Sequence, residues 1–307
     1  MQKWNIYKLA VILIFSISGS ACRQDIVLIK TTHLKNFPSA SSIEIYKKRL
    51  YIVGDDAASI LVTDTEHRIV DSISVLKSKV YRISKEEKAD LESSIILNKE
   101  TRTFLVAFSS FSTVNRNKIL FLDLHNKHVT IKSSGLGKSF KELNIEGAAI
   151  VNDKLLLSNR ANNTQSTNSF IITNSDIENG IKQEVMKTIH IILPPSKAVI
   201  GISGIAYLKE TDLLLFTAST ENTPNAYSDG IIGDSYIGVI KNISALLDQK
   251  EIKVDKLISL SRYIGRGKPQ KIESIAVQEL KEDQIIFHLA ADNDNGESTL
   301  FKMKASF

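Results

Sequence analysis

The sequence contains a single cysteine, Cys22, so its 307 residues cannot form an internal disulfide. A lone cysteine also excludes the C-x-x-C motif of many metal and redox sites. The sequence has no G-x-S-x-G nucleophile elbow, no H-E-x-x-H zinc motif and no phosphate-cradling glycine loop. The local motifs that identify the commonest hydrolases and nucleotide-binding enzymes are therefore missing.

A strong net charge and long hydrophobic runs are absent as well. The chain has 39 basic and 34 acidic side chains, and loss of Lys3 and Lys8 with an N-terminal leader leaves 37 basic ones, a net charge of +3. This excess is too small to indicate nucleic-acid binding, and no basic patch with interleaved aromatic residues is visible. The apolar run at residues 9–17 is shorter than the roughly 20 residues of a membrane span. With 43% hydrophobic residues, the composition is that of a globular protein with a sizeable core.

The first 22 residues are typical of a secretory signal, with a basic start, a short apolar run and small residues at the end. The ending GSAC at residues 19–22 resembles a bacterial lipobox, in which Cys22 becomes the lipidated first residue. Ordinary cleavage after Ala21 is the alternative. We predict that residues 1–22 are a lipoprotein signal peptide and that residues 23–307 form one domain. The protein would be a monomer anchored to the bacterial envelope, at the outer membrane, through Cys22.

A short phrase recurs five times along the chain, as in "IEGAAI" from residue 145. Its second residue is, in chain order, Ser41, Glu92, Glu146, Ser203 and Glu273. The spacings are 51, 54, 57 and 70 residues, and a second apolar run follows each copy, at residues 49–53, 103–108, 154–158, 213–217 and 284–289. Such a period predicts repetition of one supersecondary unit.

Two further apolar runs follow in the copies, for example at residues 118–122 and 128–132. Four strand-length runs in about 50 residues are typical of a β-propeller blade, and the only short helical candidate is residues 243–248. The last copy ends after three strands, so we expect residues 25–32 to supply its fourth strand and close the ring. The sequence predicts an all-β, single β-propeller with five four-stranded blades, with six as the alternative. We attribute the spacing of 70 to a loop at residues 219–235.

In a propeller the inner strands begin at the face where the second strands end, so residues from all parts of the chain should meet at one channel mouth. Glu92, Glu146 and Glu273 begin predicted inner strands. The predicted second strands are followed by Asp55, Asp56, Asn159, Arg160, Glu221, Asp292 and Asp294. Carboxylates around a narrow axis repel one another and resist desolvation. A bound cation, a basic side chain such as Arg160 or Lys271, or channel water must therefore compensate them.

Calcium suits hard oxygen ligands that arrive from several loops. The candidate calcium ligands are Glu92, Glu146, Glu273 and Asp292. The candidate ligand-binding residues are Asp55, Asp56, Arg160, Glu221, Asp294 and Lys271. Alternatively, the glutamates only fix the packing of the blades. The segment KEEKAD at residues 85–90 is interpreted as a solvated loop near the mouth, and the segment at residues 292–296 as a hairpin turn.

Nearly the whole mature chain resembles a known group of secreted proteins. The resemblance rests on "SASSIEIYKKRLYIVGDD", "KEEKADLESSI", "IEGAAIVNDKLLLSNR", "GISGIAY", "LLLFTASTE", "YSDGIIGDSYIG", "KIESIAV" and "AADNDNGES". These segments resemble the SdiA-regulated, YjiK-like propellers and the phytase-like, esterase-like domains, in particular a Bacteroidetes-type lipoprotein branch. The resemblance implies a five- or six-bladed propeller and, from the YjiK-like members, a calcium site at the channel. Ser203 departs from the glutamate pattern.

Two classes of function are compatible with these residues. The first is a lipid-anchored envelope propeller without enzymatic activity that binds calcium and a further ligand or partner at the mouth. The alternative is a calcium-dependent, phytase-like phosphoesterase, in which carboxylate-bound calcium activates water and Arg160 stabilises the developing charge. A mouth with more acidic than basic residues favours the first class, because phosphate sites usually gather several cations.

Overall fold

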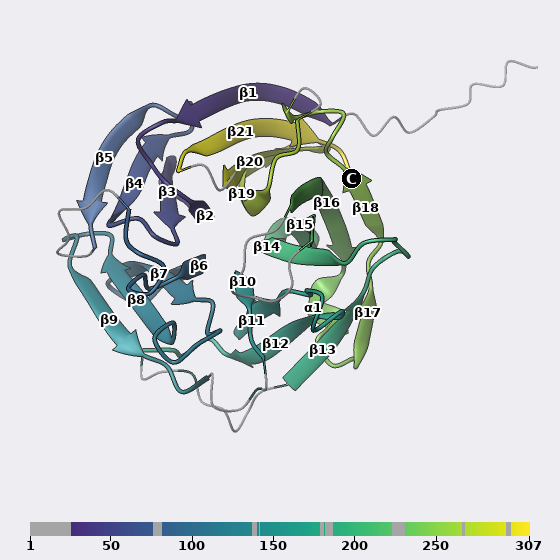
Figure 1. The fold of residues 1–307 in the computed structure, drawn as a ribbon, viewed down its shortest axis with the longest axis horizontal. Helices are drawn as coiled ribbons and strands as arrows, with labels where there is room; N and C mark the ends of the chain where they lie inside the picture. Colours follow the sequence, from purple (N-terminus) through teal and green to yellow (C-terminus); the bar gives the residue numbers. More distant parts are fainter. Residues whose placement is uncertain are drawn as a thin grey trace, which may run out of the picture.

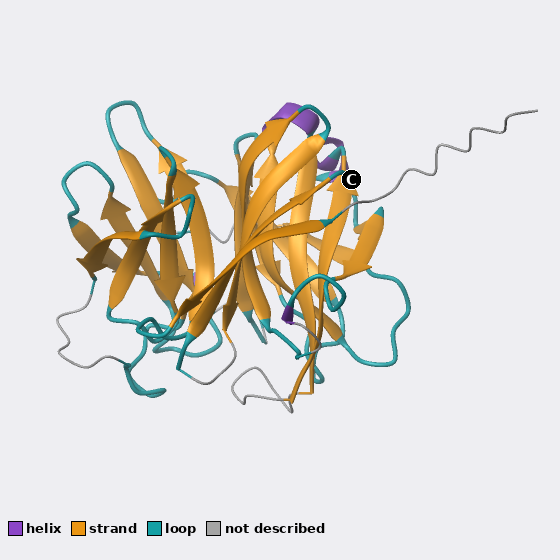
Figure 2. Ribbon diagram, turned by 90° about the horizontal axis from the view of Figure 1, so that it is seen from above, coloured by secondary structure: helices purple, strands orange, loops and turns teal. Residues whose placement is uncertain are grey.

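The computed structural model describes residues 26–75, 82–136, 140, 142–178, 181, 187–222, 231–265, 268–292 and 296–307. Five small antiparallel sheets stand around one axis, each with its first strand innermost (Figure 1). Seen from the side, the strands run between two loop-bearing faces (Figure 2). The predicted all-β, five-bladed propeller is confirmed, and the six-bladed alternative is wrong.

The strands of blades one to three follow the predicted runs closely. Blade one holds β2 (Ala40–Tyr46), β3 (Arg49–Gly54), β4 (Ser59–Asp64) and β5 (Ile69–Ser74). Blade two holds β6 (Leu91–Asn98), β7 (Thr103–Ser109), β8 (Lys118–Asp123) and β9 (Val129–Ser133). Blade three holds β10 (Ile145–Val151), β11 (Lys154–Asn159), β12 (Asn168–Asn174) and β13 (Lys187–Ile192).

Blades four and five differ in how they are completed. Blade four holds β14 (Ile200–Leu208), β15 (Leu213–Asn222), β16 (Ile231–Lys241) and β18 (Lys256–Ser259), with a 3-10 turn at Lys209–Thr211. Blade five holds β19 (Ile272–Lys281), β20 (Gln284–Asp292), β21 (Ser298–Ala305) and β1 (Val27–Leu34). Strand β1 pairs antiparallel with β21 and is the outermost strand of this blade (Figure 1). The predicted closure by an N-terminal strand is confirmed, and it removes an exposed sheet edge.

The bounds predicted for the loop at residues 219–235 are wrong at both ends, and residues 223–230 lie outside the described residues. Strands β15 and β16 extend into this segment and stay paired as far as Asn222 and Ile231. The additional length of the repeat instead includes the helical turn α1 (Ile243–Leu246) and β17 (Glu251–Lys253), inserted between β16 and β18. Strand β17 pairs in parallel with β13 and becomes a fifth strand of blade three. The chain of blade four therefore also binds its neighbour.

The core lies between the blades, where apolar side chains of adjacent sheets meet. Phe108, Phe170, Phe216, Phe287 and Phe301 are among the largest fully buried side chains. Strand β16 approaches the ring of Phe216 so closely that a Cβ atom at Gly238 would overlap it. Glycine at this position is therefore required by packing between β15 and β16.

A row of hydrogen-bonded side chains crosses the seam between blade five, which closes the ring, and blade one. Thr32 Oγ1 lies 3.0 Å from His67 Nδ1, His67 Nε2 lies 2.9 Å from His288 Nδ1, and His288 Nε2 lies 2.9 Å from Gln278 Oε1. With Gln278 Oε1 as the final acceptor, two neutral imidazoles that each donate from Nε2 satisfy every contact of the row. Burial, reinforced by the ammonium group of Lys302, lowers the pKa of His67 to about 4 and that of His288 to about 3.

Candidate functional site

Every inner strand has a β-bulge near its start, at the second residue of β2, β6, β10 and β19 and at the fourth residue of β14. The pairing with the second strand skips one residue in each blade, and the skipped residues are Ser41, Glu92, Glu146, Ser203 and Glu273. These are the same five positions that define the sequence repeat. A bulge re-aims the side chain that it carries. The repeated phrase is therefore the sequence of a bulge at the mouth end of each inner strand.

A repeated backbone hydrogen bond fixes the residue at the end of the second strand, which directly follows the strand in blades one to three and is the last strand residue, Asp292, in blade five. In four blades this residue donates its N–H to the carbonyl group that lies two positions before the bulged residue. The donor and acceptor pairs are Asp55 and Ser39 at 3.1 Å, Ser110 and Asp90 at 2.9 Å, Arg160 and Asn144 at 2.9 Å, and Asp292 and Lys271 at 3.1 Å. Side chains after the second strands are thereby held beside the bulges, and together these two sets of residues form what we call the mouth.

Arg160 joins three blades on one side of the mouth. Its Nη1 atom donates to Glu146 Oε2 at 2.5 Å and lies 3.5 Å from Glu273 Oε2, and its Nη2 atom donates to Ser219 Oγ at 2.8 Å. The guanidinium is buried, and a Cβ atom at Gly201 would lie 2.5 Å from its Nε atom. The glycine therefore makes room for the arginine.

The charges of this group nearly balance. Lys271 Nζ lies 3.1 Å from Glu273 Oε1, so each glutamate faces a basic side chain. Burial raises the pKa of Glu146 to about 7 and the charge of Glu273 adds to the rise, while Arg160 opposes it. Basic side chains, one of the three compensations that the sequence allows, are therefore present beside both Glu146 and Glu273.

Lys88 is the centre of a second group, between blades one and two. Its ammonium forms ion pairs with Asp55 and, at 2.8 Å, with Asp90 Oδ1, while Arg116 Nη1 lies 3.0 Å from Asp90 Oδ2. Oxygen atoms of Asp55, Asp90 and Glu92 all lie within 4.8 Å of one another. Burial opposes the charged form of Lys88, but the neighbouring carboxylates outweigh it and raise its pKa.

The carboxylates of this group carry more charge than their partners neutralise. Burial raises the pKa of Asp55 to about 6. Burial, with the charges of Asp90 and Asp55, raises the pKa of Glu92 well above its ordinary value. Such shifts mean that a further positive charge at this place would be stabilising.

A cavity of about 280 Å³ opens beside this group, lined by Asp55, Asp56, Arg82, Lys88 and Asp292 among others. Arg82 forms an ion pair with Asp56. Asp55 Oδ1 and Asp56 Oδ1 are buried without a hydrogen-bond partner. The wall of the cavity thus contains both charged groups and oxygen atoms that have unused capacity to accept.

The structure divides the predicted site residues into groups. Glu146, Glu273, Arg160 and Lys271 come together, as do Asp55 and Glu92, whereas Asp56 and Asp292 line the cavity. Among the described residues, the carboxylates that gather most closely are therefore not the four predicted calcium ligands. Glu221 lies inside β15 rather than after it, because that strand continues to Asn222. Asp294 and Cys22 lie outside the described residues.

Sequence reasoning found Arg160 and Lys271 but missed the other basic residues of the mouth, Arg82, Lys88 and Arg116. The interpretation of KEEKAD as a solvated loop is wrong for Lys88 and Asp90, which are largely buried. Pairing offsets the cost of burying both charges. Asp90 has a φ of 57°, in the left-handed region that aspartate tolerates better than most residues. The only signal in the sequence for a role of Lys88 and Asp90 at the mouth was their position, since they lie just before Glu92.

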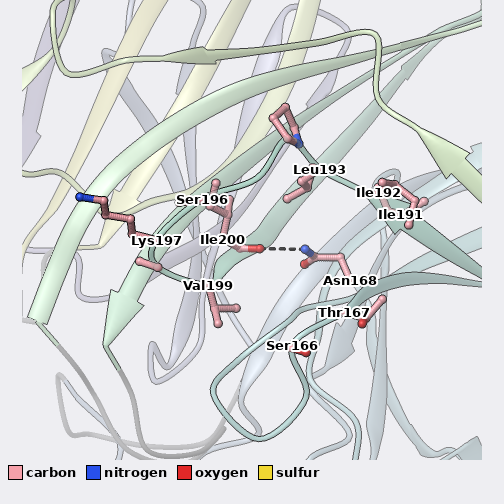
Figure 3. A pocket seen from close by; sticks show the side chains of 12 residues that line it. Ser166, Thr167, Asn168, Ile191, Ile192, Leu193, Ser196, Lys197, Val199 and Ile200 are labelled. Carbon is pink, nitrogen blue, oxygen red and sulfur yellow. Dashed lines mark hydrogen bonds between the residues drawn. The ribbon is translucent and has the colours of Figure 1, made fainter.

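A larger cavity lies away from the axis, between blades three and four (Figure 3). It measures about 370 Å³ and is bordered by the start of β12, the end of β13 and the start of β14. Its buried amide, Asn168, donates to the carbonyl of Ile200 at 2.8 Å and accepts from the N–H groups of Ala161 and Ile202. The polar capacity of that amide is used in joining the two blades.

The fold and the mouth define a five-bladed β-propeller with an ion-paired axial mouth. The chain belongs to DUF6929, a family of unknown function, whose model matches residues 36–305. It has no match among curated proteins. Within the described residues, no helix is both long enough and apolar enough to cross a membrane.

The solved structures that are similar to this chain have low sequence identity to it. Glutaminyl cyclase of Myxococcus xanthus is 8% identical with a TM-score of 0.52, over 92% of this chain and 97% of that one. A luciferin-regenerating enzyme is 10% identical with a TM-score of 0.44, over 92% and 97%. A DUF4623 family protein of Bacteroides eggerthii is 6% identical with a TM-score of 0.43, over 92% and 76%. The likeness to the glutaminyl cyclase supports the fold alone and shows no activity.

Proposed function

We propose that the protein is a lipid-anchored binding protein of the bacterial envelope that takes up calcium and a polar ligand or partner at the mouth. One observation carries this proposal. Seven carboxylates and five basic side chains from four blades gather around the mouth and its cavity: Asp55, Asp56, Asp90, Glu92, Glu146, Glu273 and Asp292, with Arg82, Lys88, Arg116, Arg160 and Lys271. Such a surface suits recognition of a polar ligand.

The donor set fits a hard cation at Asp55, Asp90 and Glu92. Their oxygen atoms are close enough to share one ion, and Asp55 Oδ1 has no other partner. Lys88 already contacts two of the three carboxylates, so calcium would share the site with an ammonium group. Bound calcium would supply the positive charge that the raised pKa values of Asp55 and Glu92 call for. The resemblance to YjiK-like propellers implies a calcium site associated with the channel, without naming these ligands.

Calcium-dependent thermal unfolding tests the site. A ligand that binds only the folded state at a hundredfold excess over its Kd stabilises by about 2.7 kcal/mol. We expect calcium to raise the Tm of the wild type relative to chelator, and Glu92→Gln to lose this rise. Glu146→Gln is the matched control and should keep it, because its partner is Arg160. Lys88→Met should enlarge the rise, because it removes the competing ammonium. No calcium response in either the wild type or Lys88→Met would contradict the site.

The phosphoesterase alternative is less well supported. Arg160, its proposed charge-stabilising residue, is buried and already contacts Glu146, Glu273 and Ser219. A phosphate group would have to break these contacts. Calcium-dependent turnover of an aryl phosphate that Glu92→Gln abolishes would nevertheless replace the binding function by the hydrolase.

A further inference from the structure

The channel contains a second cavity, deeper than the mouth and formed by all five inner strands. It measures about 220 Å³ and is lined by Glu44, Ile45, Ile95, Ile96, Ala148, Ala149, Ile150, Ile205, Ala206, Tyr207, Ile275, Ala276 and Val277. Glu44 stands three residues beyond the bulge of its strand, which is about 10 Å along the channel at roughly 3.3 Å per residue. We call this space the lower cavity.

Glu44 is the exception in an apolar layer of the channel. The residues three positions beyond the bulges in the other four strands are Ile95, Ala149, Ala206 and Ala276. The next layer along the channel, one position further on, is Ile45, Ile96, Ile150, Tyr207 and Val277. The hydroxyl of Tyr207 lies 3.0 Å from Asp212 Oδ1, so that group is already engaged. Among the residues lining the lower cavity, Glu44 is therefore the one acid and carries no partner of opposite charge beside it.

The carboxyl of Glu44 makes no hydrogen bond and no ion pair within the described part of the chain, and it borders the lower cavity. Burial raises its pKa well above the ordinary value, with no neighbouring charge contributing. A carboxylate in such surroundings is stabilised by a cation that arrives with its own hydrogen-bond donors.

The surroundings decide which cation fits. A metal ion such as calcium takes six to eight oxygen ligands, whereas the lower cavity offers one carboxylate. A quaternary ammonium group is usually held by several aromatic rings, and the lower cavity has only that of Tyr207. A primary ammonium group has three N–H donors, which can serve Glu44 and the backbone carbonyls on the free edges of the inner strands.

The size of the lower cavity limits the rest of the ligand. An apolar protein cavity of roughly 150 Å³ holds one benzene molecule. The 220 Å³ of the lower cavity therefore suits a single ring or a short branched chain with one additional polar group. We infer that the lower cavity binds a small apolar primary amine, with the ammonium on Glu44 and the apolar part against Ile96, Ile150, Tyr207 and Val277.

Calorimetric titration with benzylamine tests this inference, with benzyl alcohol as the uncharged probe of the same shape. Chelator is present throughout, so the outcome does not depend on calcium at the mouth. We expect the wild type to bind benzylamine in preference to benzyl alcohol. Glu44→Gln should weaken benzylamine binding by about tenfold or more, as expected for loss of a hydrogen bond between charged groups. Glu279→Gln is the control, because it changes an exposed glutamate on β19, the inner strand of blade five. It should leave the affinity for benzylamine unchanged.

Two further measurements separate binding from folding. Ala206→Leu fills part of the lower cavity and should abolish binding of the amine. Glu44→Gln should unfold at a Tm no lower than that of the wild type, because it removes a desolvated acid. Equal affinity of the wild type and Glu44→Gln for benzylamine would overturn the inference. Equal affinity of the wild type for benzylamine and benzyl alcohol, or no binding of benzylamine, would overturn it as well.

Discussion

Substitution of Arg160 tests most directly whether its positive charge stabilises the buried negative charges of Glu146 and Glu273. The substitution Arg160→Met keeps much of the aliphatic volume but leaves Glu146 without an ion-pair partner and Glu273 with Lys271 alone. Breaking a buried ion pair from one side costs about 3 to 5 kcal/mol. At about pH 8 we expect a loss of that size in the free energy of unfolding.

The pH dependence of this loss follows from Glu146. Its folded pKa of about 7 lies above the ordinary 4.5, so the folded state holds the proton more tightly than the unfolded chain does. Stability contributed by this group is present at low pH and is lost as pH rises through the interval between the two values. Without Arg160 the folded pKa rises further. At about pH 5.5 the variant therefore keeps Glu146 neutral, and the loss should shrink by about 1.4 kcal/mol per unit of additional shift, up to a folded pKa of about 8.

Urea unfolding in chelator at both pH values measures these losses. Arg68→Met is the control, because its ion pair with Asp64 is largely exposed and should be worth less than about 1 kcal/mol. Adding Glu146→Gln to Arg160→Met should restore part of the stability, since the unpaired carboxylate is gone. A loss below about 1 kcal/mol at the higher pH, with no coupling between the two positions, would refute the reasoning and assign the compensation to water or a bound ion.

Three further predictions concern the seam, the packing and the anchor. Acid should destabilise the seam formed by His67 and His288. Its contribution to the free energy of unfolding is complete above about pH 6.5, and on the order of 3 kcal/mol is lost towards pH 3 to 4. In urea unfolding, the stability of the wild type should therefore fall more steeply with acid than that of His288→Gln. Gly238→Ala should cost about 1 to 3 kcal/mol, with partial recovery in a Phe216→Leu background. Cys22→Ala should release the protein from the membrane fraction, and equal retention with the signal cleaved would exclude the lipid anchor.

The sequence was most informative where the same structural element is repeated. Five bulges need similar residues at similar places, so the phrase around Glu146 revealed both the blades and the mouth. Blade four was harder, because Ser219, Thr220 and Glu221 are polar and nothing local shows that they remain paired with β16. The three-residue strand β17 is held by a neighbouring blade, which a local pattern cannot show.

The composition of the mouth was predictable in part, but its pairing was not. Placing second-strand ends beside inner-strand starts brought Arg160 to Glu146, 14 residues away. Its contact with Glu273 spans 113 residues and depends on how the blades pack around the axis. The role of Lys88 was hidden for a different reason, since a lysine in a charged loop normally remains in water and only the three-dimensional grouping of Asp55 and Asp90 makes its burial favourable.

The pairing of β1 with β21 has a mechanical consequence. Val27 lies opposite Lys304 and Leu34 opposite Ser298, so both chain ends leave the sheet from the same end of the pair. Hydrogen bonds in an antiparallel pair run perpendicular to the strands. A force that pulls the two termini apart would therefore peel these bonds open one pair at a time instead of shearing them together. The ring that closes so completely at rest would open readily under tension between its two ends.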